Sequence, residues 1–134
     1  MGAIVGLAEI VLIVGDIEQS LHFYRDTLGL GVISPSTLKG PVFLQAGSGG
    51  GSVPQQIVLV PRPANVEPAA APRMGRALHH IGLQVAPGDY EAEEARLESL
   101  GFELRHGEHP FLPVRAFYLD DPDGNEVEIV SARP

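Results

Sequence analysis

The stretch from Gly107 to Glu128 reads GEHPFLPVRAFYLDDPDGNEVE and indicates two strands joined by a tight turn. The turn is the run DPDGN, Asp121 to Asn125, which combines residue types that favour chain reversal. Runs of β-forming residues at about 113–119 and 125–130 flank it. This region carries three side chains with acid, base or ligand chemistry, namely His109, Tyr118 and Glu128.

Upstream of this hairpin the chain repeats one pattern. The runs EIVLIV at 9–14 and HIGLQV at 80–85 are both short and rich in β-forming residues. Each run is followed by an aspartate that can cap a helix and, after residues at helical spacing, by a glycine that can end it; these are Asp16 and Gly29, then Asp89 and Gly101. Three more strand candidates follow each glycine, at about 31–34, 41–46 and 55–60, and at about 102–106, 113–119 and 125–130.

The repeat predicts an α+β fold of two βαβββ modules. Module 1 covers about residues 5–60 and module 2 about residues 78–131. The proline-rich segment 61–77 between them is predicted to be a linker, and the whole of 1–134 a single domain.

Composition argues against several classes of function. The chain has no cysteine, which excludes disulfides, thiolate metal sites and cysteine nucleophiles, and fits a cytoplasmic protein. Acidic residues outnumber basic ones 17 to 9, so nucleic acid is not expected as a partner. No apolar run reaches the roughly 20 residues of a membrane helix, and no basic start precedes a signal-like segment, so no membrane partner is expected.

Strand side chains alternate between the two faces of a sheet. In the run at 80–85, Ile81 and Leu83 mark the face that a helix covers, so His80 lies on the opposite face. The same count places Glu9 in the first strand and Glu128 in the last strand on the face without helices. If the sheets close into a curved surface, these three side chains lie inside a cup.

The layout resembles the vicinal oxygen chelate superfamily, which includes glyoxalase I, extradiol ring-cleaving dioxygenases and bleomycin-resistance proteins. The residues that carry the resemblance are VGDIEQSLHFYRDTLGL at 14–30, HIGL at 80–83 and DPDGNEVE at 121–128. The resemblance extends over nearly the whole chain. It implies a curved eight-stranded mixed sheet built from the two modules, a divalent metal in its cup, a small-molecule substrate or ligand, and a homodimer.

In that family the metal ligands come from the first and last strands of each module. Carried over position by position, they fall on Glu9, Val58, His80 and Glu128. Glu9 stands where metal-binding branches usually have histidine, and Val58 cannot ligate; Gln56, two residues earlier, is the substitute if the register differs. The resemblance thus implies metal binding by His80, Glu128 and Glu9. Two carboxylates and one imidazole suit Fe, Mn, Zn, Co, Ni or Mg.

The opening stretch also resembles the extradiol dioxygenase signature. The matching residues are Gly107, His109, Phe117, Tyr118, Asp121, Pro122, Gly124 and Glu128. In that branch the histidine and the tyrosine act as acid/base and orienting groups, so the resemblance implies that His109 and Tyr118 are catalytic. By contrast, His79 and His22 are expected on the surface or packed at a helix, and His106 joins the site only if its loop folds over the cup.

Three functions are consistent with these residues. The first is a metal-dependent dioxygenase, lyase or isomerase whose substrate chelates the metal through adjacent oxygens. The second is a metal-free protein that sequesters a small molecule, as in the bleomycin-resistance branch; Val58 and the acidic charge, which suits a cationic ligand, favour it. The third is an epimerase of a thioester or hydroxyacid, suggested by Gln56.

Overall fold

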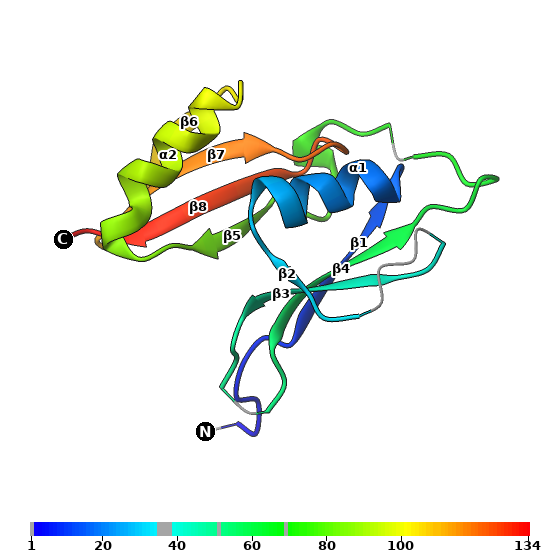
Figure 1. Cartoon of the computed structure of the whole chain (residues 1–134), viewed down its shortest axis with the longest axis horizontal. Coiled ribbons are helices and arrows are strands. Elements are labelled where there is room, and N and C mark those ends of the chain that lie inside the picture. The colour runs from blue at the N-terminus through cyan, green and yellow to red at the C-terminus, as the bar shows by residue number, and fades with distance from the viewer. Residues whose placement is uncertain (1, 35–38, 51, 69) are drawn as a thin grey trace. The chain divides into compact units, whose positions relative to one another are not determined.

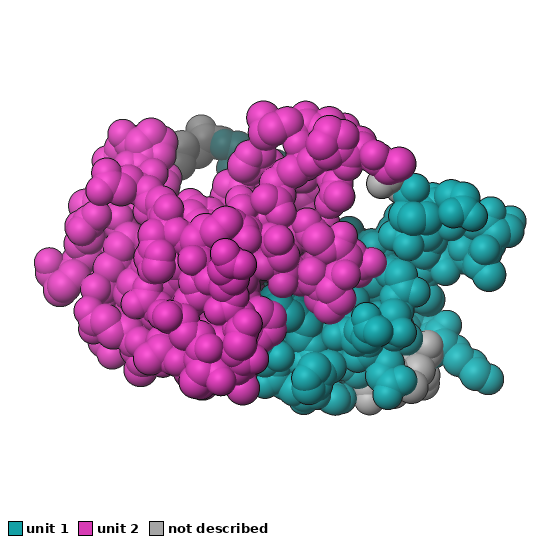
Figure 2. All heavy atoms as spheres, turned by 90° about the horizontal axis from the view of Figure 1, so that it is seen from above, with its two compact units in different colours: residues 1–69 teal, residues 70–134 magenta. Residues whose placement is uncertain are grey.

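The chain folds as the sequence of elements βαβββ repeated twice (Figure 1). The computed structural model describes residues 2–34, 39–50, 52–68 and 70–134. It divides into two compact units, Met1–Ala69 and Ala70–Pro134, each with a four-stranded mixed sheet (Figure 2). The predicted α+β class and the two βαβββ modules are confirmed. That both modules together make a single domain over 1–134 stays a prediction.

The first unit builds its sheet from strands that are far apart in sequence. Its elements are β1 (Glu9–Val14), α1 (Ile17–Leu21) with a π-helical turn (His22–Thr27), β2 (Gly31–Val32), β3 (Val42–Gly47) and β4 (Gln55–Pro61). The strand order is β1-β4-β3-β2, with β1 parallel to β4 and the other pairs antiparallel. Asp16 caps α1 as predicted, since its side chain accepts a hydrogen bond from the Gln19 N–H at 3.0 Å.

The second unit repeats this topology. Its elements are β5 (His80–Gln84), α2 (Tyr90–Ser99), β6 (Arg105–Glu108), β7 (Val114–Asp120) and β8 (Glu126–Ala132), with 3-10 turns at Arg73–Gly75 and Pro87–Asp89. The strand order is β5-β8-β7-β6, with β5 parallel to β8. Asp89 ends a 3-10 turn in a helical backbone conformation, and its side chain makes no capping bond within the described structure. Side-chain capping needs an extended backbone at this position, which Asp16 has and Asp89 lacks.

Side chains along the strands alternate as the sequence predicts. Leu12 and Val14 of β1 are buried, as are Val127 and Ile129 of β8. In the second unit, helix α2 covers this face with Tyr90, whose ring meets Phe117 of β7 edge-on at 5.3 Å between centroids. The opposite face of each sheet is therefore the one available for polar side chains. Among the described residues, no helix is long and apolar enough to cross a bilayer.

The DPDGN run forms the β7–β8 turn, and one carboxylate organises it. Oδ1 of the buried Asp121 accepts hydrogen bonds from the N–H groups of Asp123 at 2.9 Å and Asn125 at 2.8 Å. Gly124 takes the left-handed conformation, φ 81°, that the reversal requires. This turn fixes the register of β7 against β8 and so places Tyr118 directly opposite Glu128.

The two aspartates that begin the helices give a matched test of capping. Asp16→Ala should lower the free energy of unfolding by about 1 kcal/mol, because a backbone N–H loses its acceptor. Asp89→Ala should stay within about 0.5 kcal/mol of the parent, as surface changes usually do. Urea unfolding followed by far-ultraviolet circular dichroism measures both. Equal losses would contradict the assignment of the cap to Asp16 alone.

Candidate functional site

The parallel pairing of β5 with β8 assembles the candidate site within the second unit. The register sets His80 opposite Glu126 and Gly82 opposite Glu128, so these side chains share one face of the sheet. Nε2 of His80 lies 3.8 Å from Oε1 of Glu128. The side chain of Glu128 is only 15% exposed and that of His80 is 34% exposed. Two side chains that are far apart in sequence are therefore brought together at the edge of solvent.

Two glycines leave the space that this arrangement needs. A Cβ atom at Gly82 would lie 2.8 Å from Oε1 of Glu128, closer than Cβ contacts in proteins come. A Cβ atom at Gly107 would lie 3.0 Å from the ring of Tyr118. The carboxylate thus lies across the backbone of β5 and the phenol ring across β6, in volumes that any other residue type would fill.

Tyr118 fixes the orientation of the Glu128 carboxylate. Its hydroxyl donates a hydrogen bond to Oε2 of Glu128 at 2.7 Å. Burial, together with this carboxylate, raises the pKa of Tyr118 to about 12, so the phenol stays protonated and remains a donor at neutral pH. Because Oε2 is engaged by the phenol, Oε1 is the oxygen that faces His80.

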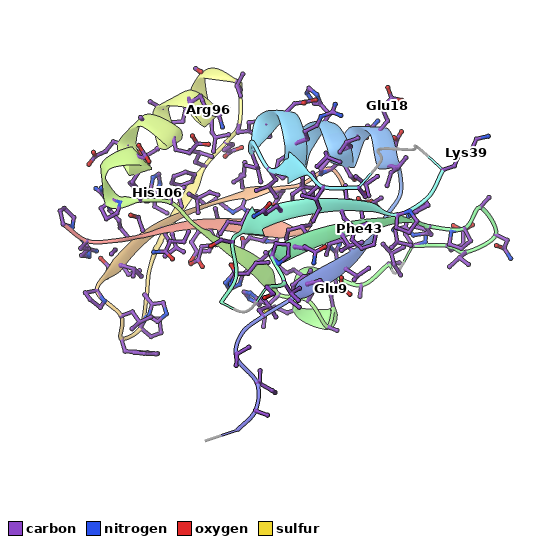
Figure 3. All side chains as sticks on the ribbon, turned by 60° about the horizontal axis from the view of Figure 1, so that its bottom comes forward. Glu9, Glu18, Lys39, Phe43, Arg96 and His106 are labelled. Carbon is purple, nitrogen blue, oxygen red and sulfur yellow. The ribbon has the colours of Figure 1, made fainter. Side chains whose placement is uncertain are left out.

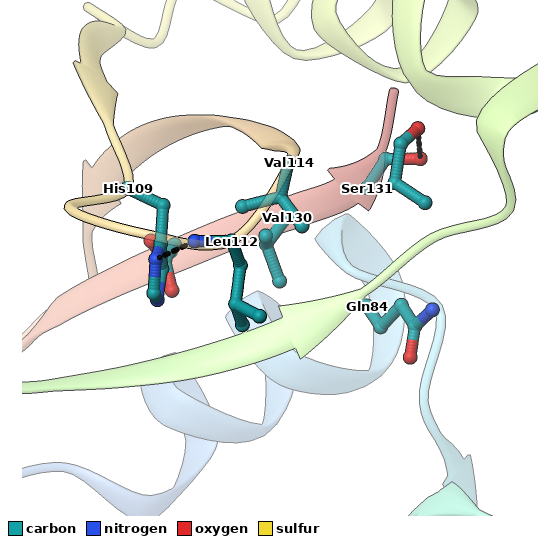
Figure 4. Close-up of a pocket in the computed structure, with 8 residues that line it drawn as sticks. Gln84, His109, Leu112, Val114, Val130 and Ser131 are labelled. Atoms are coloured by element: carbon teal, nitrogen blue, oxygen red, sulfur yellow. Dashed lines mark hydrogen bonds between the residues drawn. The ribbon is translucent and has the colours of Figure 1, made fainter. Parts of the chain in front are cut away.

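His109 lies in the loop after β6 and lines the same cavity as Glu128 (Figure 4). Its Nδ1 accepts hydrogen bonds from the backbone N–H groups of Phe111 at 3.2 Å and Leu112 at 2.9 Å. A neutral imidazole that accepts at Nδ1 carries its proton on Nε2. The cavity has a volume of about 340 Å³, and its other lining residues are Gln84, Leu112, Val114, Val130, Ser131 and Ala132. It combines an apolar wall with a few polar groups, as small-molecule sites do.

Glu9, the third predicted metal ligand, lies at the start of β1 in the first unit (Figure 3). It is exposed and lies opposite Gln56 in the β1–β4 register. Val58 lies opposite Val11 and is buried, with 2% of its surface exposed. Metal binding by Glu9 stays a prediction.

The registers of the two units can be compared directly. Glu9 begins the first strand of its unit as His80 does in the second. Val58 lies opposite the third residue of that strand, as Glu128 does. Val58 is therefore the counterpart of Glu128, and Gln56 falls two residues short of that position.

The structure adds two residues to those that the sequence indicated. Nδ1 of His79 lies 2.7 Å from Nδ1 of His80, and with Glu126 these side chains offer three ligand atoms within 4.8 Å of one another. Alternation along β5 would direct His79 to the opposite face. His79 precedes the first residue of the strand, however, so strand alternation does not determine its direction. In the sequence, the adjacency of the two histidines is the signal that could have indicated this contact.

The remaining histidines are engaged elsewhere. Nδ1 of His22 lies 3.1 Å from a carboxylate oxygen of Asp26, one turn along the same helix. His106 on β6 pairs with Glu94 of α2. His106 is therefore directed to the helix-covered side of the sheet.

Solved structures of known proteins share this fold over nearly their whole length. A glyoxalase/dioxygenase from Nostoc punctiforme matches with a TM-score of 0.75 at 22% identity, covering 96% of this chain and 92% of that chain. Lactoylglutathione lyase from Agrobacterium tumefaciens matches with a TM-score of 0.67 at 20% identity, covering 97% and 96%. The antibiotic binding protein TnmS3 from a Streptomyces species matches with a TM-score of 0.64 at 21% identity, covering 98% and 99%.

At these identities the likeness shows the fold alone. Among curated proteins no sequence matches the chain. The family model described as the Glyoxalase/Bleomycin resistance protein/Dioxygenase superfamily matches residues 6–129. This match takes in both modules, the DPDGN turn and the residues of the candidate site. The chain therefore belongs to the glyoxalase, bleomycin resistance protein and dioxygenase superfamily.

Proposed function

We propose that this chain is a metal-dependent enzyme acting on a small substrate that chelates the metal through adjacent oxygens. The observation that carries the proposal is the 3.8 Å approach of His80 Nε2 to Glu128 Oε1, beside a cavity that Glu128 lines. Bonds from imidazole and carboxylate to a divalent transition metal are about 2.1 Å long, so two of them span up to about 4.2 Å. The spacing thus allows both side chains to bind one ion.

The donor set also fits a metal chemically. A carboxylate that is largely removed from water needs compensating partners. The bond from Tyr118 supplies one of them and is the kind of outer-shell contact that orients a ligating carboxylate. We propose Glu9, from the same chain or from a second copy in a homodimer, as the third ligand. Two carboxylates and one imidazole accept Fe, Mn, Zn, Co, Ni or Mg, and three protein ligands leave positions for a substrate.

A bound divalent ion would supply Lewis acidity toward the two substrate oxygens. The side chains of Leu112, Val114 and Val130 give the apolar body of a substrate a surface to pack on. His109 is the proposed acid/base group, and its backbone contacts at Nδ1 leave Nε2–H as the donor on the other side of the ring. Tyr118, protonated at neutral pH, is proposed to hold Glu128 in place.

The second candidate function is a metal-free protein that binds and sequesters a small molecule in the cytoplasm. The observation that favours it is the register of the first unit, in which a buried valine, Val58, stands at the position that corresponds to Glu128. Without a metal, the apolar cavity alone would bind the small molecule. Metal content separates the two functions.

Protein purified without chelator and without an affinity tag should bind about one divalent ion per chain, as equilibrium dialysis with elemental analysis measures. His80→Ala and Glu128→Gln should each weaken the binding of Mn²⁺ by more than about 100-fold, the upper end of the cost of outer-shell changes. His106→Ala and Glu108→Gln, which alter the same residue types outside the cavity, should bind as the parent does. Substoichiometric metal that does not rise on addition of any of the six ions would leave only the metal-free function.

Tyr118→Phe should keep the metal but lower its affinity by roughly 10–100-fold, because Glu128 loses the donor that orients it. Isothermal titration calorimetry with the ion that the parent protein prefers measures this. Tyr90→Phe is the control, since the Tyr90 ring packs against Phe117 and beneath Arg115. An unchanged affinity in Tyr118→Phe would show that the phenol has no part in holding the ligand.

Gly82→Ala should lower metal affinity by about tenfold, equivalent to about 1.4 kcal/mol, because the added methyl group displaces Oε1 of Glu128. Gly88→Ala is the matched control, since nothing lies within 4 Å of a Cβ atom there. Calorimetry gives the affinity, and circular dichroism confirms that both variants are folded. If both variants bind metal like the parent, the space at Gly82 is irrelevant to the site.

A further inference from the structure

A second group of ligand atoms, which shares His80 with the proposed catalytic site, lies at the start of β5. The Nδ1 atoms of His79 and His80 are 2.7 Å apart, and Glu126 contributes a carboxylate oxygen to a set that lies within 4.8 Å. Both histidines are exposed and Glu126 is half-buried. We propose that His79, His80 and Glu126 form a second, solvent-facing metal site that takes Cu²⁺ or Ni²⁺.

The spacing of the nitrogens favours these ions. With metal–nitrogen bonds of about 2.1 Å, donors 2.7 Å apart subtend an angle of about 80° at the ion. Tetrahedral coordination of Zn²⁺ would need the donors about 3.4 Å apart. An angle close to a right angle suits the tetragonal nitrogen and oxygen coordination of Cu²⁺ and Ni²⁺.

Glu126 is held in position before any ion arrives. Its Oε2 accepts hydrogen bonds from Arg73 at 3.1 Å and from Arg105 at 2.9 Å. Both guanidinium groups also bind Asp120, at 2.9 Å and 2.7 Å respectively. The two positive charges are balanced by the two carboxylates, so a cation that approaches Glu126 meets a network without net positive charge. A ligand that is already ordered loses little side-chain entropy on binding.

The surface site competes with the proposed catalytic site because both use His80. Its Nδ1 faces His79, whereas its Nε2 faces Glu128 at 3.8 Å. A neutral imidazole has one nitrogen with a lone pair and one N–H. Binding of an ion at Nδ1 therefore leaves the proton on Nε2, where it points toward Glu128 instead of leaving that nitrogen to a metal. The competition rests on the proposed function, whereas the surface site itself does not.

Calorimetric titration of tag-free protein with Ni²⁺ tests the surface site. The wild type, His79→Ala and Glu128→Gln should all bind Ni²⁺, because each single variant keeps one of the two sites. The double variant His79→Ala/Glu128→Gln should bind at least about tenfold more weakly than either single variant. Adding Glu126→Gln to the Glu128→Gln protein should have the same effect. His22→Ala, which removes an exposed histidine of the first unit, is the control.

Each other outcome identifies which site is wrong. Loss of binding in Glu128→Gln alone overturns the surface site and leaves the proposed catalytic site. Loss of binding in His79→Ala alone supports the surface site and overturns the catalytic one. Binding that persists in the double variant, or is absent from the wild type, overturns both. As a direct readout, electron paramagnetic resonance of Cu²⁺ bound to Glu128→Gln should show two imidazole nitrogens, and addition of His79→Ala should remove one.

Discussion

The parallel pairing of the first strand of each unit with its last strand is the constraint on which the rest of the site depends. In the second unit it sets β5 against β8, although a helix and two further strands separate them in sequence. Burial of apolar side chains on the helix-covered face sets the register, and the register fixes which side chains are neighbours on the other face. The meeting of His80 with Glu128 therefore depends on the apolar residues that alternate with them along β5 and β8. The antiparallel pairing with β7 then adds Tyr118 from the other side.

The same backbone carries different chemistry in the two units. The pair Gly82 and Glu128 in the second unit corresponds to Val11 and Val58 in the first. A glycine beside a carboxylate leaves a polar group in an open volume, whereas two valines give an apolar patch in which Val58 is buried. Most of the polar residues that we propose to bind metal and substrate therefore lie in the second unit.

Most of the fold could be predicted from local signals. Strand alternation, the glycines that end both helices and the cap at Asp16 place the elements close to where they lie. The structure differs from the prediction where the sequence carries no local signal. Strand β6 begins at Arg105 rather than near residue 102, and a 3-10 turn that ends at Asp89 leads into α2. A glycine stop marks the end of a helix but does not determine how long the following loop remains outside the sheet.

The candidate site could be predicted only in part, for a related reason. Alternation along single strands placed His80 and Glu128 on one face. The bond from Tyr118 to Glu128 depends on the register between two strands, and the approach of His79 to His80 depends on a residue outside the strand. Neither of these follows from alternation along a single strand.

The lack of a side chain at Gly82 has a consequence for how this sequence can change during evolution. Gly82 is exposed, and an exposed glycine is usually expected to tolerate substitution. Here, however, the Glu128 carboxylate lies in the space that a side chain at residue 82 would need. Descendants of this sequence that gain a side chain there should also lose or shorten the acidic residue on the neighbouring strand. The two positions are expected to change together, because a side chain at residue 82 and a carboxylate at residue 128 would need the same space.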